Sequence, residues 1–551
     1  MKRFFRLILL CVLLVVAAAA GYLFIEVEEE QYSMLSFVPD DFVYLVESDE
    51  PIQDWQDLSG SDVWKSLKSN AFFADITESA DYLDSLLSSN KAIVDLVKLG
   101  DLVISAHMVS QQDYDFLILV DLLGKGRKAA KIKPLITQIL ETFEYRVSTE
   151  TYINNTIYRL YDPVYGENMY LAFVGNVMMF SYEANLIKKG IRQSGEPSIT
   201  LDNDFLMVHE KADPSELYSI YLNYASLNSL LNSYTSDPSD MLEGLDEILT
   251  YSVWDLRLAN DHVELDGFVR QNDSIPSYLT VFQEVGTGKV AAHEVLPAET
   301  AMMTSLGFED FEDLFLQLTD QMETESPAEY EELMKRKSQL EKLLKINVET
   351  DLFEWMTEEV VTAVVPVQNG SSHAFFALLH FDDYDLAKER LDYVAKRIGK
   401  TMVRFEESEY RGFPIRYLEL KGFFKLFFKK LFSHIDKPHY TYVDDYVIFG
   451  NDTSSLQLVI DRYLDGQVLN QVEGFEDFFD EFESRSNVFT YLQAQTFYRY
   501  LSASLDYEAR RDLQKNREDF LSFPHIGFQL DPGKGMYRTK LYSTFEPEES
   551  P

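Results

Sequence analysis

The stretch Phe37–Ser48, FVPDDFVYLVES, determines how this chain is organised, because a related stretch occurs later in the sequence. Its counterpart is Val295–Leu306, VLPAETAMMTSL, 258 residues further on. In both stretches a proline precedes a short apolar run, and the run of the first copy, Phe42–Glu47, is typical of a β-strand. Each copy therefore predicts a turn that leads into a strand.

The offset of 258 residues recurs at three further places, which indicates an internal duplication. The matched pairs are Asp101–Val109 with Glu359–Val367, Leu117–Leu122 with Phe375–His380, and Thr156–Leu160 with Pro414–Leu418.

Beyond Leu418 the offset becomes larger. Leu171–Ser181 then matches Thr441–Gly450, and Ile220–Leu231 matches Thr490–Leu501. The second copy has therefore gained roughly eleven residues, and the stretch Lys421–Phe432, KGFFKLFFKKLF, occupies this insertion.

These matches predict four parts of the chain. Residues 1–31 are a cytoplasmic stub with a transmembrane anchor, and residues 32–270 are the first repeat of an ectodomain. Residues 271–294 are a linker, and residues 295–551 are the second repeat, with the basic aromatic insertion near 421–437.

Each repeat is predicted to be α+β, a mainly antiparallel sheet with helices packed on one face. Short polar turns join the apolar runs, and each copy closes on a hairpin. The predicted hairpins are 102–122, 253–270 and 527–543; the predicted helices are 72–87, 129–143, most of 205–234, and 328–344.

Composition predicts a folded protein that does not bind nucleic acid. Of its 551 residues 46% are hydrophobic and 14% aromatic, so the chain can bury more than one core. The 92 acidic residues exceed the 49 basic ones and give a formal charge of -43. A surface of that sign repels a polyanion.

The first residues predict a membrane anchor. Leu7–Ile25 is an apolar run of 19 residues, about the length that spans a bilayer as a helix. Lys2, Arg3 and Arg6 precede the run and four glutamates follow it, which places the N-terminus in the cytoplasm. The alternative is a signal peptide cleaved near Ala18–Ala20. Cys11, the single cysteine, lies in this run, so no disulfide is expected.

The chain resembles an uncharacterised bacterial envelope family, catalogued as domain of unknown function 3352. The resemblance rests on the lone N-terminal apolar segment and on the strand opening with a proline and an acidic residue, here FVPDDFVYLVES and VLPAETAMM. It implies a bacterial envelope protein and carries over no functional residues.

The sequence shows no recognisable catalytic, cofactor or metal motif, so none is predicted. The nine histidines lack the His-Glu-x-x-His spacing, and His434 and His439 around Asp436 are interpreted as a polar loop. Gly286–Lys289, GTGK, lacks the remainder of a phosphate-binding loop, and Gly124–Lys128 is interpreted as a turn. The acidic run Asp202–Asp204 lacks the glycine and later glutamate of a calcium loop.

The basic aromatic stretch predicts an amphipathic helix with a row of lysines and a broad apolar face. It could lie in the headgroup layer of a membrane, close the core of the second repeat or the seam between repeats, or form a lid over a lipid-sized groove. Its candidate membrane- or ligand-contacting residues are Phe423, Phe424, Phe427, Phe428, Leu431, Lys421, Lys425 and Lys429.

These observations together predict a non-catalytic binding or scaffolding protein of the bacterial envelope. A single span, Leu7–Ile25, would hold it in the inner membrane with its acidic ectodomain in the periplasm, where an envelope protein or a lipid is the expected partner. The alternative is a carrier or chaperone for an apolar, lipid-like ligand bound between the repeats.

Overall fold

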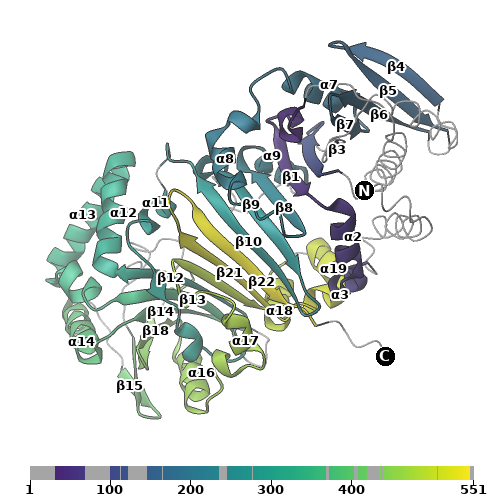
Figure 1. Cartoon of the computed structure of the whole chain (residues 1–551). Coiled ribbons are helices and arrows are strands. Elements are labelled where there is room, and N and C mark those ends of the chain that lie inside the picture. Colours follow the sequence, from purple (N-terminus) through teal and green to yellow (C-terminus); the bar gives the residue numbers. More distant parts are fainter. Residues whose placement is uncertain are drawn as a thin grey trace, which may run out of the picture. The chain divides into compact units, whose positions relative to one another are not determined.

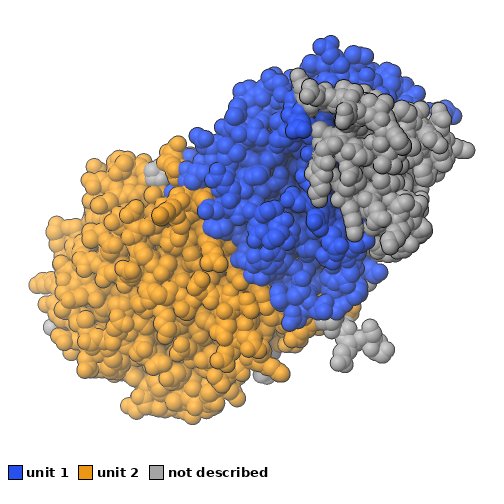
Figure 2. All heavy atoms as spheres, viewed as in Figure 1, with its two compact units in different colours: residues 1–272 blue, residues 273–551 orange. Residues whose placement is uncertain are grey.

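The computed structural model describes residues 31–68, 100–111, 113–121, 146–163, 166–234, 245–275, 277–367, 372–401, 407–417, 434–435, 438–505 and 507–546. The chain divides into two compact units, unit 1 (Met1–Asn272) and unit 2 (Asp273–Pro551), coloured separately in Figure 2. Both mix helices with antiparallel sheet, so the predicted α+β class is confirmed.

Unit 1 contains an antiparallel sheet with the strand order β4-β5-β6-β7-β3-β2-β1-β8-β9-β10 (Figure 1). Its strands are β1 (Phe42–Ser48), β2 (Leu102–Met108), β3 (Tyr114–Asp121), β4 (Arg146–Tyr152), β5 (Asn155–Asp162), β6 (Glu167–Val174), β7 (Val177–Ser181), β8 (Tyr218–Asn223), β9 (Leu249–Leu258) and β10 (His262–Gln271).

Among the described residues of unit 1, helix α7 (Ala184–Gln193) packs on β3, β6 and β7, α8 (Asn203–His209) on β9 and β10, and α9 (Tyr224–Tyr234) on β1 and β9. In α7 the apolar residues at helical spacing are buried, and Gly190 lets the helix approach the Phe37 carbonyl. Asp202 caps α8 by accepting from two backbone amides. The remaining elements are η2 (Met34–Phe37), α2 (Pro51–Gly60), α3 (Asp62–Leu67), η4 (Ile199–Leu201) and α10 (Leu245–Ile248).

Unit 2 contains an antiparallel sheet with the order β15-β16-β17-β18-β14-β13-β12-β20-β21-β22. The strands are β12 (Met302–Asp310), β13 (Thr357–Val367), β14 (Ser372–His380), β15 (Glu407–Tyr410), β16 (Phe413–Tyr417), β17 (His439–Val443), β18 (Tyr446–Gly450), β20 (Val488–Gln493), β21 (His525–Pro532) and β22 (Tyr537–Thr544). A separate two-stranded ladder joins β11 (Gly288–Lys289) to β19 (Arg485–Ser486).

Helices cover both faces of the unit 2 sheet, whereas the sequence predicted one covered face. Val360 and Val361 are neighbours on β13, yet they belong to different apolar clusters. Because successive residues of a strand point to opposite faces, the apolar run of β13 buries both. In Figure 1, α12 (Phe311–Glu325), α13 (Pro327–Leu344) and α14 (Tyr384–Thr401) lie on one side, and α16 (Thr453–Leu464) and α17 (Phe475–Phe479) on the other.

The other described helical elements of unit 2 are α11 (Tyr278–Phe282), η5 (Ala292–Glu294), a π-helical turn (Glu349–Phe353), η8 (Leu469–Gln471), α18 (Ala494–Ser504), α19 (Tyr507–Lys515) and α20 (Arg517–Leu521).

The two sheets have the same strand order, and the register of β1 with β8 agrees with that of β12 with β20 residue by residue. Tyr44 of β1 pairs with Leu222 of β8, and Met302 of β12 pairs with Leu492 of β20. Tyr44 and Met302 are separated by the smaller of the two offsets found in the sequence. Leu222 and Leu492 are separated by the larger one. In the β2–β3 hairpin the offset differs by one, because Ile104 pairs with Ile118 while Thr362 pairs with Ala377. The predicted match of Leu117–Leu122 to Phe375–His380 is therefore displaced by one residue.

An aromatic cluster occupies the same place in each core. In unit 1 the rings of Phe205 and Tyr221 are 5.5 Å apart, and in unit 2 those of Phe475 and Tyr491 are 5.1 Å apart. All four side chains are fully buried. Phe205 and Phe475, like Tyr221 and Tyr491, are separated by the larger of the two sequence offsets.

The predicted helical region 205–234 contains a strand. α8 ends at His209, and β8 (Tyr218–Asn223) follows before α9 begins. Tyr218–Asn223 alternates between intermediate and buried positions and pairs with β1, so a non-local contact overrides the helical tendency of its neighbours. Helix 328–344 is confirmed as α13.

Some predicted features lie outside the described residues. They are the apolar run Leu7–Ile25, the helices 72–87 and 129–143, and the basic aromatic stretch 421–432. Within the part of the chain that the structure does describe, no helix is both long enough and apolar enough to span a bilayer.

Candidate functional site

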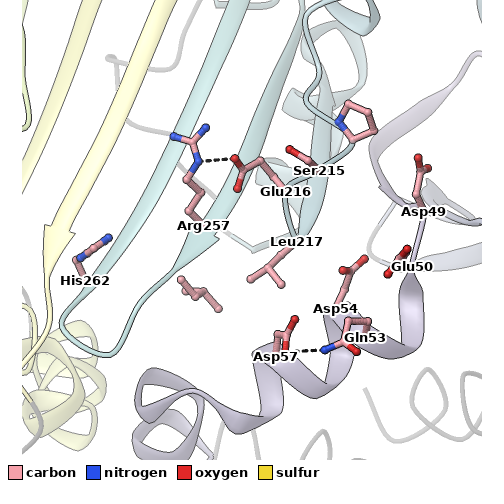
Figure 3. A pocket seen from close by; sticks show the side chains of 12 residues that line it. Asp49, Glu50, Gln53, Asp54, Asp57, Ser215, Glu216, Leu217, Arg257 and His262 are labelled. Atoms are coloured by element: carbon pink, nitrogen blue, oxygen red, sulfur yellow. Dashed lines mark hydrogen bonds and ion pairs between the residues drawn. The ribbon is translucent and has the colours of Figure 1, made fainter. Parts of the chain in front are cut away.

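A pocket of about 940 Å³ opens in unit 1 where three segments meet. The first segment is the end of β1 with helix α2, the second is the loop Pro214–Leu217 before β8, and the third is the β9–β10 hairpin. Figure 3 shows the acidic side chains of the α2 segment facing Glu216 and Arg257 across the pocket. The antiparallel neighbours β1, β8 and β9 bring these segments together.

The α2 segment supplies four carboxylates: Asp49, Glu50, Asp54 and Asp57. Pro51 begins the helix, and its fixed φ suits the first helical position. Asp54 is buried and accepts from the Ser48 hydroxyl, and Asp57 accepts from Gln53 Nε2 at 2.9 Å. Both partners are neutral, so they do not compensate the charge.

The opposite wall holds the guanidinium of Arg257, which is already engaged by carboxylates. Its Nε lies 2.6 Å from Glu216 Oε1, and its Nη1 lies 2.6 Å from Asp266 Oδ2 and 3.6 Å from Glu264 Oε1. These carboxylates raise the pKa of Arg257 above its ordinary value, Glu216 contributing most. Arg257 thus holds the wall together, and within the part of the chain that the structure describes no Lys, Arg or His forms an ion pair with the α2 carboxylates.

The pocket is therefore strongly electronegative. Its lining contains five carboxylates and one guanidinium, a formal charge of -4 with His262 neutral. Burial, followed by the charges of Glu47 and Glu50, raises the pKa of Asp49. Burial raises the pKa of Asp54 as well, with further contributions from Glu50 and Asp57. Burial is the larger cause of both shifts and repulsion between the carboxylates adds to it, so a bound cation would stabilise their ionised forms.

Unit 2 contains a second unusual carboxyl group, Glu359, which is fully buried. Ser305 Oγ donates to its Oε1, and its Oε2 accepts from the Tyr446 hydroxyl and from the amides of Ala291 and Ala292 at 3.3 and 3.2 Å. Burial raises the pKa of Glu359 to about 7, although all four donors favour the ionised form. No solvent reaches this group, so it is a structural anchor for the segment 291–292.

A Ser-His-Asp arrangement also occurs in unit 1, but its serine and histidine are buried and its aspartate is exposed. His107 Nε2 lies 2.9 Å from Ser105 Oγ, and His107 Nδ1 lies 3.1 Å from Asp41 Oδ1. A catalytic serine must reach its substrate, yet Ser105 and His107 are fully buried, and the exposed member is Asp41, which Lys189 also binds. Hydrogen bonds from His107 and Lys189 hold the pKa of Asp41 well below its usual range.

This burial predicts that Ser105 does not act as a nucleophile. A fluorophosphonate probe, which labels activated serines, should label the wild-type chain no more than the Ser105→Ala variant, as measured by intact-protein mass spectrometry. Labelling of wild type that the Ser105→Ala substitution removes would instead show that the arrangement is catalytic.

Comparison with known proteins identifies the family. The family model described as "Protein of unknown function (DUF3352)" matches residues 125–404, which is half of the chain. This chain belongs to that family. The resemblance noted in the sequence is thereby confirmed. No curated protein matches the chain.

Two solved structures are similar to part of this DUF3352 member. Crystal forms I and III of TP0453 match at 8% and 9% identity, with TM-scores of 0.25 and 0.23, and each match covers 48% of this chain and 90% of the other. At these scores neither likeness bears on function.

The histidines that the sequence singled out in this DUF3352 member are packing residues. His434 stacks on Phe375 at 4.4 Å, and His439 lies 4.9 Å from the ring of Tyr417. Among the described residues no group of three or more His, Cys, Asp or Glu side chains could hold a metal.

The other motifs considered in the sequence have structural places where they are described. Gly288 and Lys289 of GTGK form β11, and Asp202 is the cap of α8. The eight residues proposed in the basic aromatic stretch, and Gly124–Lys128, lie outside the described residues.

Sequence reasoning missed the acidic pocket, although a signal for its α2 wall was present. Glu50, Asp54 and Asp57 follow one another at spacings of four and three residues. That spacing places like charges on one helix face, where they destabilise an isolated helix. A local concentration of this kind differs from the scattered acids of a solvated surface.

Proposed function

We propose that this DUF3352 member is a non-catalytic binding protein whose unit 1 pocket receives a cationic group of its partner. The observation that carries the proposal is the pocket itself, with five carboxylates around about 940 Å³ and a single guanidinium that is already paired. A cleft of one charge sign attracts ligands of the opposite sign and raises their local concentration.

The polar lining favours a cationic over an apolar ligand in this pocket. Leu217, Leu258 and Pro214 are its apolar members, and the remaining nine lining residues are polar or charged. Transfer of an ammonium or guanidinium group into such a site is compensated by direct carboxylate contacts. The alternative proposal is a carrier for an apolar ligand bound between the repeats.

The same proposal includes the membrane anchor and the duplication. A helix over Leu7–Ile25 would tether the protein to the bacterial inner membrane and expose both repeats to the periplasm; the flanking charges support this orientation. Descent of the two units from one duplicated segment is supported by their matching strand orders and registers. The pocket then belongs to the first repeat, and an envelope protein is the expected partner.

The test is the binding of a labelled tetralysine peptide to the full chain, measured by fluorescence polarisation. The variant Asp49→Asn/Glu50→Gln/Asp57→Asn changes three exposed carboxylates of the pocket and should weaken binding about tenfold or more. The control Asp320→Asn/Glu323→Gln/Glu331→Gln makes the same change in net charge on the exposed surfaces of α12 and α13 and should change affinity by less than about twofold. Equal losses in both variants would show that the tetralysine peptide recognises net charge and not the pocket.

A further inference from the structure

In unit 2, the place that corresponds to the unit 1 pocket is filled by the chain itself. The registers of β1 with β8 and of β12 with β20 align Asp49 and Glu50 with Gly307 and Phe308, and the loop Pro214–Leu217 with Ser484–Asn487. No residue is gained or lost between these positions and the paired strands, so the correspondence extends directly from the ladder.

A shared contact confirms that the two loops are held alike. In unit 1 the Asp213 amide donates to Asp255 Oδ2 at 2.9 Å. In unit 2 the counterpart amide of Glu483 donates to Gln529 Oε1 at 3.0 Å. Both loops are therefore fixed, just before β8 or β20, by a side chain of the next strand.

The segment that fills the unit 2 site is Gly286–Val290, which runs along the loop and contains the short strand β11. Gly288 and Lys289 pair antiparallel with Ser486 and Arg485 as β11 and β19, and the Val290 amide donates to the Ser484 carbonyl at 3.0 Å. Side chains of the loop complete the grip, since Asn487 Nδ2 donates to the Gly286 carbonyl and Arg485 Nη2 to the Thr287 carbonyl.

The segment also lies directly on the end of β12. A Cβ atom placed on Gly307 would be 2.8 Å from the Gly288 amide nitrogen, and one placed on Gly288 would be 2.7 Å from the Phe308 amide nitrogen. Only glycines permit this approach. Gly307, Phe308 and the four residues of the loop thus hold the segment, and their six counterparts in unit 1 all line the open pocket.

The unit 1 wall retains the means to bind a main chain. The Pro214 carbonyl receives no hydrogen bond from the residues that the structure describes. Its counterpart in unit 2 is the Ser484 carbonyl, which accepts from the Val290 amide.

The two sites differ in charge. Asp49, Glu50 and Glu216 occupy the positions that Gly307, Phe308 and Ser486 occupy in unit 2. The difference adds three carboxylates, so an occupant of unit 1 would carry more basic side chains than Gly286–Val290, whose one basic residue is Lys289.

This chain's own counterpart segment is a poor occupant. At the offset of 258 residues, Gly286–Val290 corresponds to Glu28–Tyr32, EEEQY, whose glutamates would be repelled by the acidic lining. Tyr32 is held elsewhere, because its amide donates to Asn176 Oδ1 at 2.7 Å, and Asn176 does not line the pocket. The occupant is therefore sought in another polypeptide.

We propose that the unit 1 pocket binds an extended, lysine- or arginine-bearing segment of a partner protein, laid along Pro214–Leu217 as Gly286–Val290 is laid along Ser484–Asn487. The inference rests on the proposed function and adds the form of the ligand. The main chain of the segment would bond to the loop, and its basic side chains would reach the α2 carboxylates.

The probe is the labelled, capped peptide KGKGKVA. It has the sequence of Val285–Ala291 with lysine in place of Val285 and of Thr287. N-methylation of its valine removes the donor that corresponds to the Val290 amide and keeps the charge. N-methylation of its alanine is the matched control, because the Ala291 amide bonds to Glu359 and not to the loop. Binding to the full chain is expected to weaken about tenfold with methylated valine and by less than about twofold with methylated alanine.

The outcomes separate the two proposals. If methylated valine costs less than about twofold while the Asp49→Asn/Glu50→Gln/Asp57→Asn variant still loses binding, the extended seating is wrong and the cationic site stands. If that variant binds the peptide as wild type does, both fail. If replacing Glu28, Glu29 and Glu30 together by Gln changes peptide affinity by about tenfold or more, this chain's own segment is the occupant and the partner is excluded.

Discussion

Replacing Glu359 by Gln is expected to remove a stability change of about 3 kcal/mol between pH 5 and pH 8. The pKa of Glu359 is raised from 4.5 to about 7 in the folded chain, chiefly by burial. The folded state therefore binds the proton more tightly than the unfolded state does. The contribution of this group to stability is complete below about pH 4.5 and is lost as the pH rises through about 7.

The measurement is urea unfolding of wild type and Glu359→Gln at several pH values, with the difference in unfolding free energy plotted against pH. Tyr446→Phe is the matched control, because it removes a donor that favours the carboxylate. The pKa of Glu359 should then rise further, and the loss of stability should extend to higher pH. Parallel pH profiles for wild type and Glu359→Gln would contradict the assignment.

Phe205→Ala and Phe475→Ala are each expected to destabilise their own unit by about 3–5 kcal/mol. Both rings are fully buried at matching places in the two cores, and each packs on a buried tyrosine of the strand that pairs with β1 or β12. Truncation to alanine leaves a cavity in a cluster of aromatic side chains, which cannot collapse to fill it.

Hydrogen–deuterium exchange read by mass spectrometry locates the effect. Phe205→Ala should speed exchange in Tyr218–Asn223, and Phe475→Ala in Val488–Gln493. Leu201→Ala is the control, because this leucine is 70% exposed and its removal should cost less than about 0.5 kcal/mol. An effect of Phe475→Ala as small as that of Leu201→Ala would show that the two cores are not built alike.

Much of the fold could be predicted because the signals that define it are local. The alternation within Phe42–Glu47 and the recurrence of its pattern 258 residues later pointed to a strand in each copy, and both are present as β1 and β12. Tyr218–Asn223 was mistaken for helix because its partner, β1, lies near the other end of the same unit's sequence. The one-residue displacement in the second hairpin was invisible for a similar reason, since only the strand register reports it.

The candidate site was much harder to foresee. The carboxylates of α2 could be read from their spacing, yet nothing near them indicates Glu216 or Arg257. Glu359 is one acid among 92 in the sequence, and only the structure shows that Ser305, Tyr446 and the segment 291–292 enclose it. Burial and charge pairing arise between distant segments, so composition carries no record of them.

The amino-acid order alone was enough to predict the α+β class, the acidic composition and the family resemblance, and it suggested the internal duplication that we propose, because periodicity, charge and repetition can be read directly from the order of residues. Pairing of β1 with β8 and of β8 with β9 was needed to create an acidic pocket in one unit, and the path of Gly286–Val290 was needed to fill the same place in the other. Those differences depend on which distant backbone segments meet, and that is settled by the free energy of the whole fold.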